Sequence, residues 1–233
     1  MPAGHRSRYL IGLLTCVVMT CAASISPQSQ VESARVPADF PEAHYLQARG
    51  LGKNILRVDS AKSLVVIEVH RAGAFARQGH DHVVASHNLS GYVSMAEGLA
   101  DLLVPLEHLV VDEAELRTEA GFNTQPSQED TKATRRNMLK ETLESERFPY
   151  AYIHIARLDA DPPALNVSIT LHGITRNYEI QPKIEAVLSG IAVDGRMSFN
   201  QSDFGITPFS VLGGALQVQD KLDLRFHILA LDN

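Results

Sequence analysis

The sequence predicts an all-β fold, a closed antiparallel barrel of about eight strands with one inserted helix. The clearest observation is the last stretch, where apolar and polar residues alternate from Leu216 to Ile228, as in a strand with one buried face. Several stretches before it, such as residues 64–70, are short and rich in β-branched residues. Residues 127–149, in contrast, contain good helix formers. Closure is favoured because an open sheet leaves edges that invite association.

The first 23 residues have the composition of a secretory signal peptide. Arg6 and Arg8 provide a basic start, and the apolar run of about a dozen residues that follows is too short for a membrane span. Ala22 and Ala23 are small residues that suit cleavage. We therefore expect a periplasmic or secreted protein whose mature chain begins near Ser24.

Both cysteines, Cys16 and Cys21, lie in this segment. The mature chain is therefore expected to lack disulfides and to depend on packing, which a chain of this size can supply. A lipoprotein acylated at Cys21 is the alternative. It is less favoured because Thr20 stands where lipoprotein signals usually have Gly or Ala.

Residues 24–50 predict a linker, because prolines, serines and glutamines interrupt any apolar periodicity. A short helical turn is expected after Pro41 and should end at Gly50, since Pro suits the start of a helix and Gly its end. Residues 51–233 then form a single β-rich domain.

The strands of this domain are expected where β-branched and aromatic residues alternate with others. In YAYIHIARL, Tyr152 and His154 fall on one face and Ile153 and Ile155 on the other. His172-Gly173 is a turn signal. The stretches with strand character are 64–70, 150–158, 164–173, 177–188 (interrupted at Pro182), 195–205 and 214–232.

The inserted helix is expected within residues 127–149. Ser127 with Asp130 resembles a capping box, and Met138 begins a modest apolar stripe. Pro149 should stop the helix. We interpret this helix as packing on, or capping, the sheet, rather than as a source of catalytic arginines.

The charge balance excludes one class of partner. Without Arg6 and Arg8, 19 of the 21 basic side chains remain against 27 acidic ones, a net charge of −8. Such a chain repels phosphate backbones, so no nucleic-acid partner is expected. No later stretch approaches the roughly 18 consecutive apolar residues of a membrane span.

Four stretches together carry a family resemblance. The most specific is VSITLHGITRNYEI at 167–180, and the others are 56–69, 138–155 and 200–206. Over roughly residues 54–231 they resemble the YceI-like, polyisoprenoid-binding family. The resemblance implies an extended, lipocalin-like antiparallel β-barrel whose apolar interior holds a long isoprenoid chain, in an exported protein. It provides no catalytic residues.

GHDHVV, at residues 79–84, suggests a metal site. In a strand, His80 and His82 share one face, about 6.5–7 Å apart, and Asp81 and His87 face away. Zinc needs three or four ligands, so another strand would have to complete the site. The histidines available for this are His70, His154, His172 and His227.

Catalysis is not expected, because no nucleophile elbow, mature cysteine or phosphate loop accompanies the histidines. In the simplest interpretation His80 and His82 are half-exposed turn and strand residues. In the functional interpretation they lie at the mouth of the barrel and bind a polar head group. Phe148, Phe204 and Phe209 are further candidates for ligand contact. Packing in the core is favoured for Phe204 and Phe209.

The predicted function is that of an exported protein that binds an isoprenoid lipid, such as a polyisoprenoid phosphate or quinone, and needs no cofactor. One alternative is a periplasmic metal-binding or stress protein that uses His80 and His82. Another is a structural barrel with a filled core. Peripheral membrane contact and a homodimer are the other associations considered.

Overall fold

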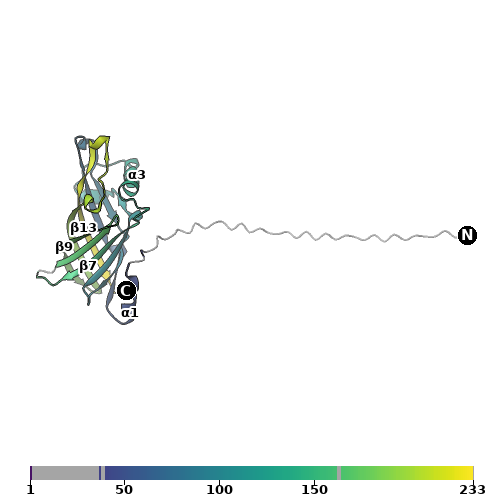
Figure 1. Ribbon diagram of the computed structural model, residues 1–233, viewed down its shortest axis with the longest axis vertical. Helices are drawn as coiled ribbons and strands as arrows, with labels where there is room; N and C mark the ends of the chain where they lie inside the picture. Colours follow the sequence, from purple (N-terminus) through teal and green to yellow (C-terminus); the bar gives the residue numbers. More distant parts are fainter. Residues whose placement is uncertain (2–36, 38–39, 162–163, 233) are drawn as a thin grey trace. The chain divides into compact units, whose positions relative to one another are not determined.

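A large antiparallel β-sheet dominates the structure (Figure 1). The computed structural model describes Met1, Pro37 and residues 40–161 and 164–232. The described elements belong to one compact unit, residues 36–233. The expected signal peptide, with Cys16 and Cys21, lies outside the described residues.

Within the described residues, thirteen strands form one sheet, in which every pairing is antiparallel. The strands are β1 (Ile55–Val58), β2 (Leu64–Ala72), β3 (His82–Ser86), β4 (Ser90–Ser94), β5 (Leu99–Pro105), β6 (Val110–Val111), β7 (Tyr150–Leu158), β8 (Ala164–Leu171), β9 (Ile174–Ile180), β10 (Lys183–Val187), β11 (Gly190–Asn200), β12 (Ser210–Val211) and β13 (Leu216–Leu231). The α-helices are α1 (Glu42–Gly50), α2 (Ala114–Glu119) and α3 (Gln128–Asn137).

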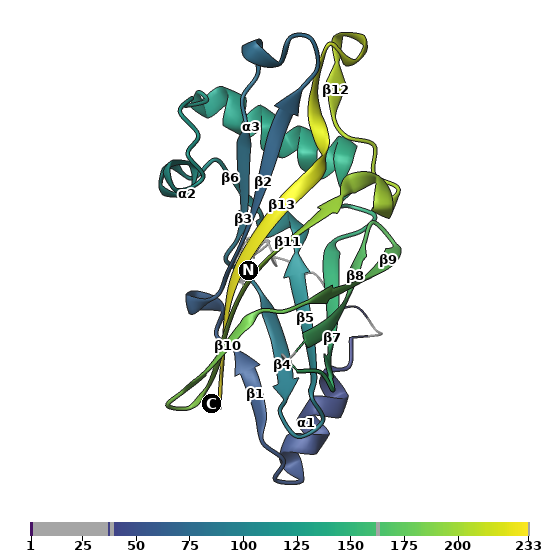
Figure 2. The same ribbon diagram turned by 90° about the vertical axis from the view of Figure 1, so that its left-hand side faces the viewer.

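The expected closed barrel of about eight strands is wrong in strand number and in closure. The hydrogen-bonded order is β6-β3-β2-β13-β1-β4-β5-β7-β8-β9, with β11 and β12 also on β13 and β10 on β11 (Figure 2). No described strand pairs with the free edge of β9. Side chains make contact there instead, since Tyr178 of β9 and Phe199 of β11 have ring centroids 6.3 Å apart. A strand pattern predicts buried faces but does not predict which edges pair.

Most of the expected strands are present, but the one expected at 195–205 begins earlier, at Gly190, and ends at Asn200, where a 3-10 helix, η5 (Gln201–Phe204), follows. β7 spans the predicted residues, and the break at Pro182 separates β9 from β10. His172 and Gly173 have φ angles of +52° and +75°, as a tight turn requires. The alternation of the final stretch is that of β13, which pairs with β2 along one edge and with β11 along the other.

The inserted helix is shorter than expected. Ser127 and Asp130 form the predicted capping box. After α3, however, the chain widens into a π-helical turn, Met138–Thr142, and Glu144, with φ of +45°, turns it away before Pro149. The proline therefore follows the helix and does not stop it. The short helix α2 has no counterpart in the expectations.

α1 begins after Pro41 and ends at Gly50, as the sequence predicts. Its side chains Tyr45 and Ala48 are buried, so this part of the expected linker packs on the outer face of the sheet beside Ile55 and Tyr92. No described helix has the length and apolarity needed to cross a membrane.

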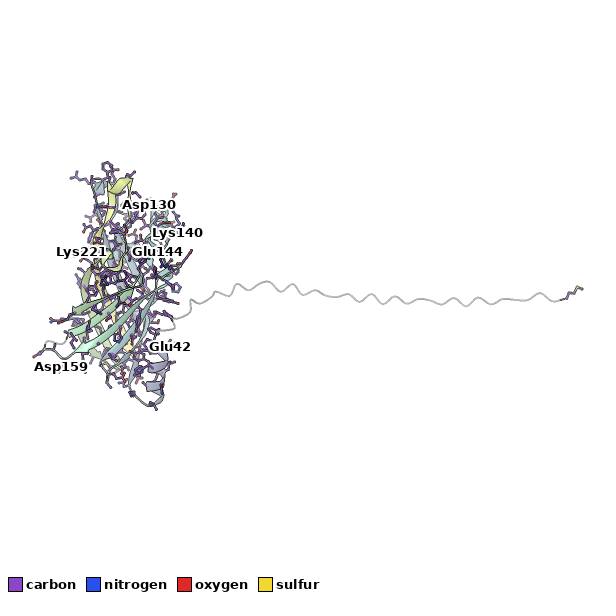
Figure 3. All side chains as sticks on the ribbon, viewed as in Figure 1. Glu42, Asp130, Lys140, Glu144, Asp159 and Lys221 are labelled. Atoms are coloured by element: carbon purple, nitrogen blue, oxygen red, sulfur yellow. The ribbon has the colours of Figure 1, made fainter. Side chains whose placement is uncertain are left out.

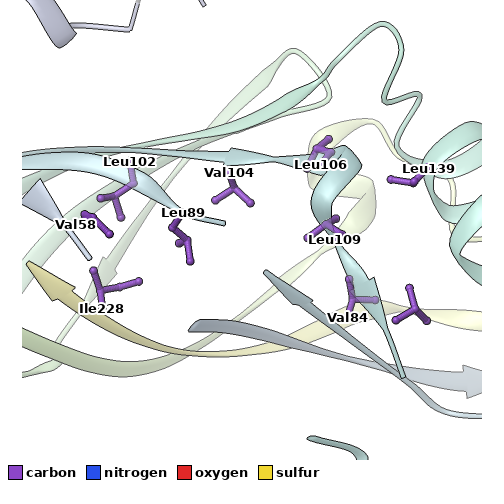
Figure 4. Close-up of a cluster of buried hydrophobic side chains, with 10 residues drawn as sticks. Val58, Val84, Leu89, Leu102, Val104, Leu106, Leu109, Leu139 and Ile228 are labelled. Atoms are coloured by element: carbon purple, nitrogen blue, oxygen red, sulfur yellow. The ribbon is translucent and has the colours of Figure 1, made fainter. Parts of the chain in front are cut away.

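The inner face of the sheet is apolar. Figure 4 shows one buried cluster drawn from β1, β3, β5 and β13, which includes Val84, Leu102 and Ile228. Charged side chains such as Lys140, Glu144 and Lys221 are exposed on the outside of the unit (Figure 3).

Candidate ligand-binding cavity

The inner face of the sheet surrounds a cavity of about 500 Å³. Strand alternation builds its wall. In β7, Ala151, Ile153 and Ile155 line the cavity, whereas Tyr152 and His154 bind Asp101 on the outer face. The volume lies within the range of small-molecule sites, about 300–1,000 Å³. A filled core leaves few voids larger than a water molecule.

The cavity is long and mostly apolar. Along β13 its lining extends from Leu216 to Ala230, at most roughly 45 Å of extended strand. The side chains between these limits are mainly those of Val, Ile, Leu and Phe. Such a shape suits a chain-like apolar ligand better than a compact polar one.

Polar side chains gather at the end of the cavity near α3, which we call the α3 end. Its polar lining residues are Arg71, His80, His82, Thr134, Asn137 and Gln217. The π-helical turn adds Met138 and Thr142 to the lining. π-Helical turns are rare in proteins, and those that occur are often found at functional sites.

His80 and His82 lie together at the α3 end, with ring centroids 6.4 Å apart. β3 begins at His82, so His80 precedes the strand. His80 Nδ1 is buried and has no hydrogen-bond partner among the described residues. His82 Nδ1 lies 2.7 Å from Asp112 Oδ2. Among the described residues its Nε2 has no hydrogen-bond partner, and His82 is part of the cavity lining.

A buried ion network holds His82 in place. The side chains of Asp112 and Arg117 are only 1% and 4% exposed. Asp112 accepts hydrogen bonds from the Val83 amide, at 3.1 Å, and from Arg117. Burial acts to raise the pKa of Asp112, but the hydrogen bond and charge of His82, with the bonds from Val83 and Arg117, hold it below its usual value. Asp112 is therefore ionised, and His82 donates from Nδ1.

The other polar residues of the GHDHVV region have separate partners. Asp81 accepts a hydrogen bond from the Arg71 amide at 2.9 Å. His87 lies 2.8 Å from Glu113 and is exposed. The Asp81 carbonyl also accepts a hydrogen bond of 2.6 Å from Arg117, so its backbone joins the network that holds His82, whereas no described hydrogen bond connects His87 to that network.

The three candidate phenylalanines have different positions. Phe209 lines the cavity. Phe204 is fully buried in the core beside Phe199 and is not part of the lining. Phe148 also lies outside the lining, with its ring 4.5 Å from that of His172. Of the three phenylalanines only Phe209 is part of the cavity lining. Aromatic character in the sequence does not distinguish core packing from cavity lining. Ligand contact by Phe148 and Phe204 stays a prediction.

Among the described residues, no three His, Cys, Asp or Glu side chains are placed to hold a metal ion. The histidines considered as a third ligand have other partners. His154 binds Asp101, His172 binds Glu144 and His227 binds Asp194. His70 lies between Asp81 and Asp223, 3.8 Å and 3.9 Å from their carboxylates. The metal-binding alternative therefore lacks its third ligand in this part of the chain.

A second buried carboxylate, Asp101, lies under α1 on the outer face. It accepts hydrogen bonds from Tyr45, at 2.6 Å, and from Tyr152, and His154 Nδ1 lies 2.8 Å away. Burial, followed by the bond to Asp101, raises the pKa of Tyr45. This cluster binds α1 to the sheet and has no access to the cavity lining.

Sequence reasoning missed Asp112, Arg117 and Asp101. Asp112 and Arg117 are distant in sequence from His82, and no local motif connects them. The one available signal was the placement of a carboxylate directly after an apolar strand, in VVDE at 110–113.

Comparison with known proteins identifies a family for the chain and solved structures with a similar fold. A family model described as the YceI-like domain matches residues 57–230. No protein with a curated function matches the chain.

Two solved structures share the fold. A polyisoprenoid binding domain from Saccharophagus degradans, implicated in plant cell wall breakdown, is 12% identical. That match has a TM-score of 0.54 and covers 76% of this chain and 98% of the other. BcnA of Burkholderia cenocepacia is 14% identical, with a TM-score of 0.50 and coverage of 73% and 98%. At these identities the likeness is one of fold.

Proposed function

The chain belongs to the YceI-like domain family, and on that premise we propose that it binds a long isoprenoid-type lipid in the cavity and is not an enzyme. The observation that carries the proposal is the apolar cavity of about 500 Å³, which extends along β13 from Leu216 to Ala230. The polyisoprenoid binding domain from Saccharophagus degradans has the same fold and supports this ligand class.

Energetics favour a long ligand. Burial contributes about 0.8 kcal/mol for each CH₂ group, whereas association costs about 4–15 kcal/mol in lost freedom. A chain of about 20 buried carbon atoms gains about 16 kcal/mol and exceeds that cost. The net gain is about 1–12 kcal/mol, so over most of this range a long chain binds tightly without a polar contact.

We further propose that the polar head of the ligand, a phosphate or a quinone, lies at the α3 end. His82 offers a free Nε2 there, and the unpartnered Nδ1 of His80 lies nearby. The His82→Ala variant should weaken the binding of a lipid with a neutral head group by about 0.5–1.5 kcal/mol, and that of a lipid with a charged head group by about 1.5–3 kcal/mol. A prenyl chain without a head group should bind both proteins equally.

We also propose that the protein is exported. The support is the basic and apolar pattern of residues 1–23. N-terminal sequencing of the exported protein tests this proposal. A mature chain that starts near Ser24 supports a soluble form, whereas a retained, acylated Cys21 indicates a membrane-anchored one.

The central experiment is native mass spectrometry, with lipid extraction, of the protein purified from its own envelope. A co-purifying prenyl lipid, or uptake of an added prenyl phosphate or prenyl quinone, is the expected result. The Ala151→Trp variant fills the cavity and should lose the lipid. Ala186→Trp, on the exposed strand β10, should retain it. Lipid-free wild-type protein that takes up neither probe would overturn the proposal.

A further inference from the structure

Two loops lie side by side beyond the α3 end of the cavity, at the top of Figure 2. We call them the tip loops. They are residues 73–78, between β2 and β3, and residues 210–215, which include the short strand β12 and lead into β13. The Phe75 amide donates a hydrogen bond of 2.7 Å to the Ala215 carbonyl, and Gly73 also approaches that carbonyl closely. The loops therefore form one surface.

This surface exposes large apolar side chains. Phe75 is 45% exposed, Val211 39% and Leu212 71%. Leu212 also has a φ of +54°, in the left-handed region where Gly or Asn is favoured. A leucine at this position is unfavourable both in its backbone conformation and in its exposure to water. A partner that covers the side chain would offset the second cost.

The charge of the tip loops is opposite to that of the chain. The whole chain has a net charge of −6, yet Arg77 is the only charged residue in the two loops. No charged side chain occurs between Phe204 and Gln219. Exposed apolar side chains beside a cation, with no carboxylate in the same loops, are compatible with an anionic bilayer surface, which attracts each Lys or Arg near it by about 1 kcal/mol.

The tip loops are continuous with the cavity. Gly79 and His80 follow the first tip loop, Val211 lies in the second, and Leu216 follows the second at the start of β13. All four line the cavity. Val211 is thus both exposed and part of the cavity wall. A membrane in contact with the tip loops would therefore lie next to the α3 end.

We propose that the tip loops dock on an anionic phospholipid bilayer, with Phe75 and Leu212 inserted among the acyl chains and Arg77 at the phosphates. The lipid of the proposed function would then enter or leave the cavity without crossing water. A second copy of the chain is a poorer occupant, because a stable interface buries about 800 Å² on each partner and this surface presents only three large apolar side chains.

The test uses the absence of tryptophan from the chain. Phe75→Trp places the single tryptophan of the chain in the tip loops, and excitation at the red edge of its absorption avoids the six tyrosines. Leu188→Trp places one at the exposed turn between β10 and β11, as a matched control. Each full-length variant is mixed with phosphatidylglycerol vesicles, with phosphatidylcholine vesicles, or with brominated forms of the same lipids.

With phosphatidylglycerol, emission from Phe75→Trp should shift to shorter wavelength and be quenched by bromine, while Leu188→Trp stays unchanged. Adding Leu212→Ser to Phe75→Trp should raise the lipid concentration at half-maximal shift at least about tenfold. An unchanged Phe75→Trp spectrum, or equal shifts in both reporters, would overturn docking. A blue shift that depends on protein concentration without vesicles would overturn it in favour of self-association.

The docking proposal rests on the proposed lipid-binding function, but the experiments test the two separately. The fluorescence change needs no ligand in the cavity, and lipid content is measured independently by mass spectrometry. Lipid-loaded protein whose tip loops ignore vesicles contradicts docking alone. Docking by a protein that never holds lipid contradicts the proposed function alone.

Discussion

Replacing Asp112 by Asn should destabilise the protein strongly. The Asp112 side chain is 1% exposed and accepts hydrogen bonds from Val83, Arg117 and His82. Asn keeps the shape and tolerates the backbone φ of +59° at this position. The substitution therefore removes mainly the negative charge.

The magnitude follows from the partner that remains. Without the carboxylate, the guanidinium of Arg117, 4% exposed, is a buried charge without a counter-ion. Breaking such a pair on one side costs about 3–5 kcal/mol, out of a total free energy of unfolding of about 5–15 kcal/mol. Adding Arg117→Met should restore part of the loss, because the uncompensated charge is then gone.

Urea unfolding followed by far-ultraviolet circular dichroism measures the effect. Asp194→Asn is the matched control, because Asp194 also lies 2.7 Å from a histidine, His227, but the two side chains are 43% and 45% exposed. An exposed pair contributes about 0–1 kcal/mol. If Asp112→Asn lost no more stability than Asp194→Asn, the buried network would not support the α3 end as argued.

Three further predictions concern the outer face and the packing. NMR titration should give Glu97 a pKa of about 2, below its usual 4.5, chiefly because Lys53 hydrogen-bonds to it. The stability from this contact is complete above pH 4.5 and is lost as the pH falls toward 2. A normal Glu97 titration would contradict the contact. Tyr45→Phe removes a bond to a buried carboxylate and should cost about 1–3 kcal/mol. It should also speed amide exchange in α1, and unchanged exchange would contradict this role. Gly91→Ala, whose Cβ would lie 2.3 Å from a backbone carbonyl oxygen, should cost about 1–3 kcal/mol in urea unfolding. Gly50→Ala, with no atom within 4 Å, should cost less, and equal losses would contradict the close packing.

Strand identity could be predicted because it depends on local alternation. β7 and β13 appear where residues 150–158 and 214–232 alternate, and the turn at His172-Gly173 separates β8 from β9. The capping box of Ser127 was equally local. The end of the helix was not, because the π-helical turn and the positive φ of Glu144 depend on packing over the cavity.

The sequence by itself determined the β-rich class, the faces of the strands and the family. All of these depend on residues close together in the chain or on matched motifs. Only the tertiary structure decided that the sheet stays open beside β9, that Phe204 fills the core while Phe209 lines the cavity, and that Asp112, held by Arg117, binds His82. The physical reason is that an inward apolar side chain looks the same in sequence whether it faces another side chain or an empty cavity. Its environment is set by segments that are distant in the chain.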